Sequence, residues 1–309
     1  MKFFKPFVIA IVLAVTSSCT LDKTDFEAEI NRNATEHIEF KQVNSFNNGN
    51  YKISIEALNG TFYKGYNEIR LTILNTRTNQ ILNNSEITFL PILTNFDNNK
   101  TSCPHKYHLN YNTEKQYYSG YAVFTSISNP MENWDLYISF TDSNQTHTMN
   151  QLVTVQNQTN MNLNMTEFIG NDGEQYFIAL VAPQKPKVAE NELVAGIYKY
   201  NPPTEPSGSF PDPSQFTFEE VSGYTLKLDP RMPEPSMGNH SSPNNRDLVQ
   251  LMNGKFYHGV VNYTMTGNWT LNFIMINENG KIIKGTEVSK DFTPGIEGTK
   301  SELFIDILF

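Results

Sequence analysis

Residues 228–269 read LDPRMPEPSMGNHSSPNNRDLVQLMNGKFYHGVVNYTMTGNW, and residues 90–134 read LPILTNFDNNKTSCPHKYHLNYNTEKQYYSGYAVFTSISNPMENW. The two stretches align without a gap from Pro91 and Pro230 to Gly120 and Gly259, with matched residues always 139 positions apart. Internal self-similarity of this kind is typical of a duplicated structural unit. The chain therefore holds two related copies of one domain, and 309 residues are enough for each copy to bury a core.

Short runs of β-branched and aromatic residues alternate with turn residues along both copies. In residues 134–140 and again in residues 269–275, every second side chain is large and apolar. Side chains two residues apart share one face of a strand, so the tryptophan that begins each run is expected in a core. Further strands are expected at residues 51–55, 69–73, 87–89 and 121–124. The pattern predicts an all-β chain of two tandem immunoglobulin-like antiparallel β-sandwiches.

Changes in composition predict where these domains begin and end. The predicted segments are a lipoprotein-type signal peptide at residues 1–18, a polar tether at 19–43, a first domain at 44–156, a linker at 157–164 and a second domain at 165–309. The second copy also carries a proline-rich insertion at residues 201–213. Proline cannot donate to a β-ladder, so this insertion is expected to be an extended, exposed loop.

The start of the chain predicts export. Lys2 and Lys5 precede a short apolar run and several small residues, which is the layout of a secretory signal. Cys19 follows the small residues as in a bacterial lipoprotein signal, where it would become the lipidated first residue. The protein would then be anchored by lipid to the bacterial envelope, at the outer membrane or the cell surface. Plain secretion or a periplasmic location, with Cys19 retained, is the alternative.

Charge and cysteine content narrow the classes of partner. The formal net charge is −9 and no basic stripe is present, which argues against nucleic-acid binding. The chain has two cysteines, so a lipidated Cys19 leaves Cys103 without a disulfide partner.

Neither a Ser/His/Asp constellation, nor a paired-carboxylate signature, nor a glycine-rich phosphate loop occurs in a suitable context. The sequence therefore predicts a protein that is not an enzyme.

Two residues of the second copy stand out against the first. Residues 230–245 contain four prolines and are expected to form a loop. Within them, Met237 and His240 occupy the positions of Asn98 and Thr101, so the shared scaffold does not require an apolar or aromatic side chain there. Methionine normally fills gaps in cores. Its presence in this loop, three residues before a histidine, predicts a metal-binding role for both.

Two further methionines are candidate ligands with an alternative role. Met232 matches Leu93, so it is expected to be either a metal ligand or an apolar anchor at the base of the loop. Met265 has the strand parity of Val261, which predicts an inward side chain that serves either as a third sulfur ligand or as core. His258 has the opposite parity and is not expected among the ligands.

Thioether sulfur is a soft, neutral ligand, and imidazole suits several late transition metals. Together they favour copper, Cu(I) above all, over zinc, calcium or magnesium. We therefore expect copper as the cofactor, bound by Met237 and His240 with support from Met232 and Met265.

The second copy also resembles the YtkA-like domain family. The resemblance covers most of residues 185–309 and, more weakly, residues 45–155. The matching positions are Leu228, Pro230, Met232, Met237, His240, Tyr257, Gly259, Met265, Gly267 and Trp269. The family consists of small extracytoplasmic bacterial domains of immunoglobulin-like fold, often associated with copper or heavy-metal handling. The resemblance implies the same fold and a similar role for the second domain.

The first copy departs from this pattern at every Met and His position. It offers Cys103, His105 and His108 instead, and a thiol with two imidazoles is a candidate second metal site. The alternative is that these residues are merely solvated in an exposed loop. The first domain would then be a spacer or an interaction module.

The sequence is compatible with two functions. The first is a lipid-anchored copper protein that buffers the metal or delivers it to a metal-transfer protein partner. The second is a non-catalytic surface module for adhesion, carbohydrate contact or assembly of an envelope complex. Its expected contact residues are exposed Tyr117, Tyr118 and the proline-rich insertion.

Overall fold

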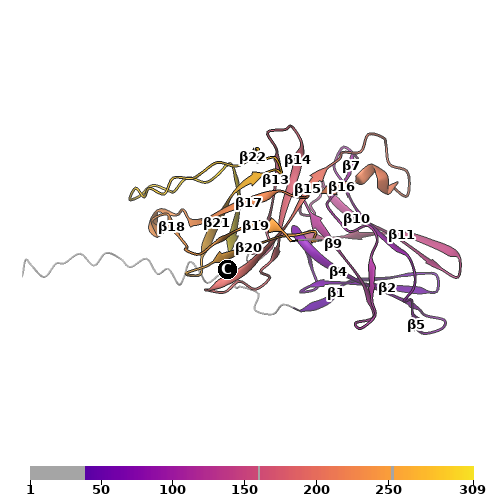
Figure 1. Cartoon of the computed structure of the whole chain (residues 1–309). Coiled ribbons are helices and arrows are strands. Elements are labelled where there is room, and N and C mark those ends of the chain that lie inside the picture. Colours follow the sequence, from indigo (N-terminus) through magenta and orange to yellow (C-terminus); the bar gives the residue numbers. More distant parts are fainter. Residues whose placement is uncertain (1–38, 159–160, 252–253) are drawn as a thin grey trace, which may run out of the picture. The chain divides into compact units, whose positions relative to one another are not determined.

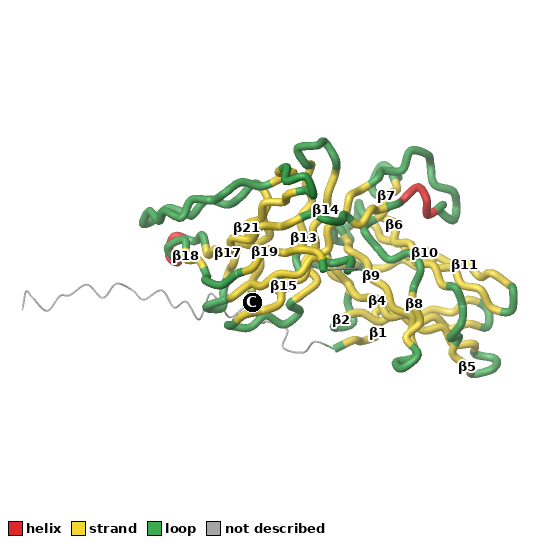
Figure 2. Tube along the Cα trace, in the orientation of Figure 1, coloured by secondary structure: helices red, strands yellow, loops and turns green. Residues whose placement is uncertain are grey.

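The computed structural model describes residues 39–158, 161–251 and 254–309. Over these ranges the chain forms β-sheets, antiparallel except for one two-stranded pair, and two short 3₁₀ helices, without an α-helix (Figure 1, Figure 2). No helix in the described ranges is both long and apolar enough to cross a membrane. The prediction of an all-β chain is confirmed. The expected signal peptide and Cys19 lie outside the described residues.

Two sheets in the first copy share one apolar core. One sheet has the strand order β1 (Phe40–Asn48), β2 (Tyr51–Leu58), β4 (Gly65–Asn75), β9 (Tyr117–Phe124) and β8 (Asn110–Asn112), with β5 (Gln80–Ile81) paired to β4. The other has the order β11 (Gln145–Val153), β10 (Asn133–Asp142), β6 (Ile87–Thr94) and β7 (Lys100–Ser102). A short parallel pair joins β3 (Phe62–Tyr63) to β12 (Val155–Gln156).

Buried and less buried side chains alternate along the central strands, and the buried ones form this core. Every second residue of β4 is buried, and Ile69 and Leu71 are completely inaccessible. In β10 the buried face begins at Trp134 and ends at Phe140, both 0% exposed. Burying a side chain of this size stabilises the fold by roughly 1.5–3 kcal/mol relative to leaving it in water. The expected core position of Trp134 is confirmed.

The second copy forms one continuous sheet around its core. Its strand order is β13 (Met165–Ile169), β14 (Gln175–Ala182), β15 (Glu190–Tyr200), β20 (Tyr257–Asn262), β19 (Arg246–Gln250), β17 (Thr225–Met232), β21 (Asn268–Ile276) and β22 (Ile282–Lys284). Three more strands pair with members of this series: β16 (Phe218–Glu220) with β15, β18 (His240–Ser241) with β17, and β23 (Leu303–Leu308) with β21. Strand β19 pairs with both β20 and β17 and so joins them into one sheet. The equivalent strands of the first copy, β9 and β6, lie in separate sheets. Trp269 is 0% exposed, as expected.

Equivalent hydrogen bonds recur in the two copies. The side chain of Asn67 donates to two backbone carbonyls, and its oxygen accepts from the amide of Tyr63 at 2.9 Å. Asn191 makes the same set, accepting from the amide of Lys187 at 3.1 Å. Both asparagines are buried at the start of their strands, so their amides satisfy backbone groups that a ladder does not reach.

A buried tyrosine repeats in the same way. The hydroxyl oxygen of Tyr118 accepts from the amide of Ser85 at 2.9 Å, and that of Tyr257 accepts from the amide of Tyr224 at 3.2 Å. These partners keep the 139-residue separation found in the sequence. The features that the copies share therefore belong to the scaffold. Tyr118 was expected to be an exposed contact residue, and this prediction is wrong, since its exposed fraction is 1%.

The first strand begins earlier than the expected tether allows. Residues 40–43 were assigned to the tether, but β1 starts at Phe40 and pairs with β2 from Phe40 opposite Leu58. The ring of Phe40 lies 3.2 Å from the guanidinium carbon of Arg70, a cation–π contact. An edge strand such as β1 buries little of its surface, so its sequence lacks the strong alternation that marks the central strands.

Pro230 was predicted to lie in a loop, and the structure corrects this. It lies within β17, opposite Leu271 of β21. On the other side of β17, pairing with β19 covers residues 225–226 and pairing with β18 covers residues 231–232. Pro230 therefore falls where that ladder is interrupted, and its missing N–H costs no hydrogen bond there.

The proline-rich insertion is largely irregular but not simply exposed. It leads into η1 (Pro213–Phe216), whose N-cap Asp212 accepts from the amide of Ser214. Phe216 is 1% exposed because it packs with Leu90, Ile92 and Tyr137 of the first copy. The 3₁₀ helix directly after the insertion thus packs on the outer face of the first copy's four-stranded sheet.

Candidate metal centre

The loop that carries the predicted ligands turns back on β17. After Met232 the chain forms η2 (Pro235–Met237) and then passes through two left-handed residues, Gly238 (φ 64°) and Asn239 (φ 53°). These positive φ values reverse the chain, and β18 then pairs with β17 so that His240 lies opposite Met232. Glycine and asparagine are the residues that most readily adopt this conformation.

His240 reaches the turn between β20 and β21. Its Nε2 lies 2.8 Å from the hydroxyl oxygen of Thr264. The imidazole also packs edge-on against Trp269, with ring centroids 6.1 Å apart. The ring is therefore held between the core and the turn of residues 263–267, at one end of the second sandwich.

Met232 has the burial of an anchor. Its exposed fraction is 2%, and it belongs to the core cluster of the second copy. A Cβ at Gly267, which adopts a φ of 129°, would lie 2.9 Å from the Met232 methyl carbon. Of the two expected roles, this burial favours the apolar anchor that its match with Leu93 predicts. Met237 is only half-buried, and its side chain packs against the edge of the same core.

Met265 does not point inward as predicted. Strand β20 ends at Asn262, and Met265 lies in the following turn with 36% of its surface exposed. The parity argument failed because it assumed a regular strand up to this residue. The backbone of Met265 is nevertheless fixed, since its carbonyl accepts from the Trp269 Nε1 at 3.0 Å. Met265 directly follows Thr264, whose hydroxyl is the hydrogen-bond partner of His240.

The three residues of the candidate second site lie in different surroundings. Cys103 is 0% exposed within the core of the first copy, and burial raises the pKa of its thiol well above the usual value. His105 directs its Nδ1 to the carbonyl of Cys103 at 2.7 Å, while His108 is exposed beside Glu86. In the part of the chain that the structure describes, no three His, Cys, Asp or Glu side chains gather to hold a metal. The thiol at this position therefore serves as core.

His105 predicts a pH dependence of stability. Burial lowers the pKa of this imidazole to about 4, from 6.5 in the unfolded chain. The folded ring stays neutral while the unfolded one takes up a proton, so stability falls as the pH drops from about 6.5 to about 4. Allowing for partial exposure of the ring, we expect this residue to contribute a loss of about 2 kcal/mol. Urea unfolding at pH 7 and pH 4.5 measures it, with His105→Gln as the comparison. Equal losses in both proteins would contradict the assignment.

Two residues near the loop were not singled out from the sequence. Tyr263 packs on Trp269 with ring centroids 5.4 Å apart, and its buried hydroxyl has no hydrogen-bond partner in the described ranges. The first copy has Phe124 at this position, so the scaffold does not require the hydroxyl. Asn239, which matches Lys100, is also buried. Comparing the copies at the 139-residue separation would have found both.

Comparison with known proteins does not assign the chain to a family. No family model matches the chain, and no curated protein matches it. The resemblance to the YtkA-like family therefore stays a prediction that rests on the residues of the second copy.

Three side chains at this end of the second sandwich are candidate metal donors. They comprise one imidazole and two incompletely buried thioethers, from His240, Met237 and Met265. Zinc and calcium sites are usually built from several thiolates, imidazoles or carboxylates. Thioethers with one imidazole are compatible with Cu(I).

Proposed function

We propose that the protein is a lipid-anchored component of a bacterial envelope that binds Cu(I) at the end of its second sandwich. His240 and Met237 are the primary ligands, and Met265 supplies a further sulfur from the neighbouring turn. Met232 supports the loop from the core. In this proposal both copies are immunoglobulin-like domains of the YtkA-like type, and only the second holds metal.

One contact supports the proposal above the others. The hydrogen bond between His240 and Thr264 brings the histidine of one loop next to the turn that carries Met265. In the first copy, Thr101 stands in place of His240 and Ser126 stands in place of Met265. The potential ligands of both segments therefore occur together in the second copy only. A site at the edge of a sandwich, with few ligands and partial exposure, suits a protein that buffers copper or passes it to a partner.

The proposal predicts a loss of copper affinity from two substitutions. We expect Met237→Ala with His240→Ala to weaken Cu(I) binding at least tenfold, because two of the ligands are removed. The purified protein is titrated with Cu(I) without oxygen, against a competing chelator. The matched control is Asn98→Ala with Thr101→Ala, the equivalent positions of the first copy, which should leave the affinity unchanged.

A wild-type protein that binds Cu(I) no more tightly than the double variant would contradict the proposal. If a difference appears with Cu(II) alone, the histidine site remains but the thioether ligands do not. A protein that binds neither ion would favour the non-catalytic surface module instead.

A further inference from the structure

A long irregular segment interrupts the last hairpin of the second copy. In the first copy, β10 pairs with the single strand β11 along its whole length. In the second copy, β21 pairs with β22 at one end and β23 at the other, and residues 285–302 connect the two. We call residues 285–302 the strap. In Figure 1 the strap runs beside the loop that carries β18.

We call residues 233–241, which carry Met237 and His240, the ligand loop. Asn239 of this loop forms hydrogen bonds with the strap. Its side chain is buried, with an exposed fraction of 6%. The amide nitrogen donates to the carbonyl of Ser289 at 3.0 Å and to that of Asp291 at 3.2 Å. Both side-chain N–H groups are therefore used on strap backbone, one residue before His240.

The strap also contacts the loop at its other end. The amide of Gly298 donates to the carbonyl of Pro233 at 2.7 Å. A Cβ at Gly298 would lie 2.6 Å from the side-chain oxygen of Asn239, so only glycine fits without displacement. Phe292 packs over Gly238, since a Cβ at that glycine would be 3.6 Å from its ring. The loop between Pro233 and Asn239 is thus contacted along its length.

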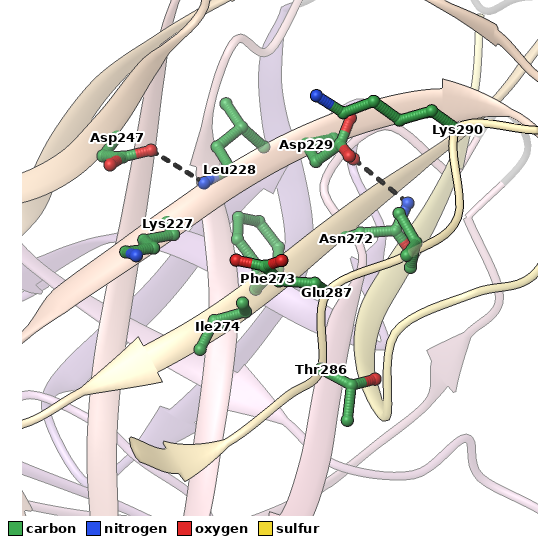
Figure 3. A pocket seen from close by; sticks show the side chains of 11 residues that line it. Lys227, Leu228, Asp229, Asp247, Asn272, Phe273, Ile274, Thr286, Glu287 and Lys290 are labelled. Carbon is green, nitrogen blue, oxygen red and sulfur yellow. Dashed lines mark hydrogen bonds between the residues drawn. The ribbon is translucent and has the colours of Figure 1, made fainter. Parts of the chain in front are cut away.

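The loop and the strap are each fixed to the sheet as well. Arg231 of β17 is 4% exposed and donates to the carbonyl of Asn239 at 3.4 Å. Ser301, at the end of the strap, donates its hydroxyl to the carbonyl of Phe273 at 2.9 Å. Figure 3 shows Thr286 and Lys290 of the strap beside strands β17 and β21, where they line a hollow of about 270 Å³. The strap therefore spans from the sheet to the loop.

The first copy has none of this arrangement among its described residues. Lys100 stands in place of Asn239 and is only partly buried. The equivalent turn is held by local bonds instead: the side chain of Asn95 accepts from the amides of Asp97 and Asn99. Strap, buried asparagine and candidate ligands thus occur together in one copy.

From this coincidence we infer that the strap is a brace for the ligand loop and that Asn239 is a positioning residue. It sets the backbone that presents Met237 and His240, and it touches no metal itself. The role of the brace in presenting metal ligands rests on the proposed function. The brace itself is a property of the fold that is measurable without copper.

The first test removes the two donated hydrogen bonds without changing the shape of the side chain. Asn239→Asp places a carboxylate oxygen against the carbonyls of Ser289 and Asp291. We expect amide hydrogen exchange in residues 233–241 and 286–300 to quicken about tenfold, with the remaining sheet unchanged. Cu(I) affinity should fall about tenfold, as is usual when support outside the ligand set is lost. The control is Asn79→Asp, which is also left-handed (φ 55°) but exposed.

The second test approaches the same contact from the strap. Gly298→Ala should quicken exchange in the same two segments. Combined with Asn239→Asp it should add little further, because both changes displace the side chain of residue 239 from the strap. X-ray absorption of the copper-loaded variants should show altered sulfur or nitrogen scattering, which a uniform loss of stability would not produce.

The outcomes separate the brace from the copper site. Fast exchange in both segments supports the brace even if the wild-type protein binds no Cu(I), a result that would overturn the proposed function alone. Unchanged exchange in Asn239→Asp would overturn the brace, whatever the copper affinity. Additive effects of the two substitutions, or exchange that quickens throughout the sheet, would also contradict it.

Discussion

Trp269→Ala is expected to lower the free energy of unfolding by about 3–5 kcal/mol, the cost of emptying a large buried site. The indole is 0% exposed and packs on Tyr263 and His240. Its Nε1 also holds the carbonyl of Met265, so the substitution frees the turn that carries the third candidate ligand. Chemical denaturation followed by circular dichroism measures the loss.

Trp134→Ala is the matched control in the first copy. Trp134 is equally buried and donates to the carbonyl of Ser126 at 3.1 Å. We expect a similar loss of stability but no change in Cu(I) affinity, because the first copy lacks the Met and His ligands. A loss below about 1 kcal/mol for either variant would contradict the core position of that tryptophan.

Phe216→Ala is expected to cost about 3 kcal/mol, near the lower end for a buried phenylalanine. Phe216 lies just after the insertion of the second copy, in η1, yet it packs with Leu90, Ile92 and Tyr137 of the first. Its removal should therefore loosen the coupling between the copies as well as reduce stability. Each copy contains one of the two tryptophans, so single-tryptophan variants report on each copy separately by fluorescence.

With Phe216 present, we expect the two tryptophans to report the same unfolding midpoint, and with alanine there we expect the midpoints to separate. The control is Phe96→Ala, since Phe96 is 76% exposed and its loss should change stability by under about 0.5 kcal/mol. Identical midpoints and stabilities for Phe216→Ala and the wild-type protein would show that Phe216 does not couple the two copies.

The strands and the core were predictable because burial on one face of a sheet imposes a period of two. Trp134 and Trp269, with the alternation after them, placed the buried faces of β10 and β21 correctly. The edge strand β1 was missed because a half-exposed strand carries no such period. Pro230 was misplaced because whether a strand position needs its N–H depends on its neighbours in the sheet, which the local sequence does not show.

The candidate site was only partly predictable for a similar reason. Comparison of the copies singled out Met237 and His240 as candidate ligands, and that role stays a prediction. Met265 and Cys103 were misjudged because the end of a strand and the burial of a loop residue depend on contacts with distant segments. The strap has no counterpart in the first copy, so alignment of the copies passed over it. Its partner Asn239 was visible in that alignment but has no metal chemistry of its own.

X-ray absorption of the Cu(I)-loaded wild-type protein tests the central claim most directly, because it identifies the atoms bound to the metal. We expect both sulfur and nitrogen in the first coordination shell, from the thioethers of Met237 and Met265 and the imidazole of His240. Met237→Ala should reduce the sulfur contribution, and His240→Ala should remove the nitrogen. A shell of nitrogen and oxygen alone, or one unchanged by both substitutions, would contradict a Met/His site in the second copy.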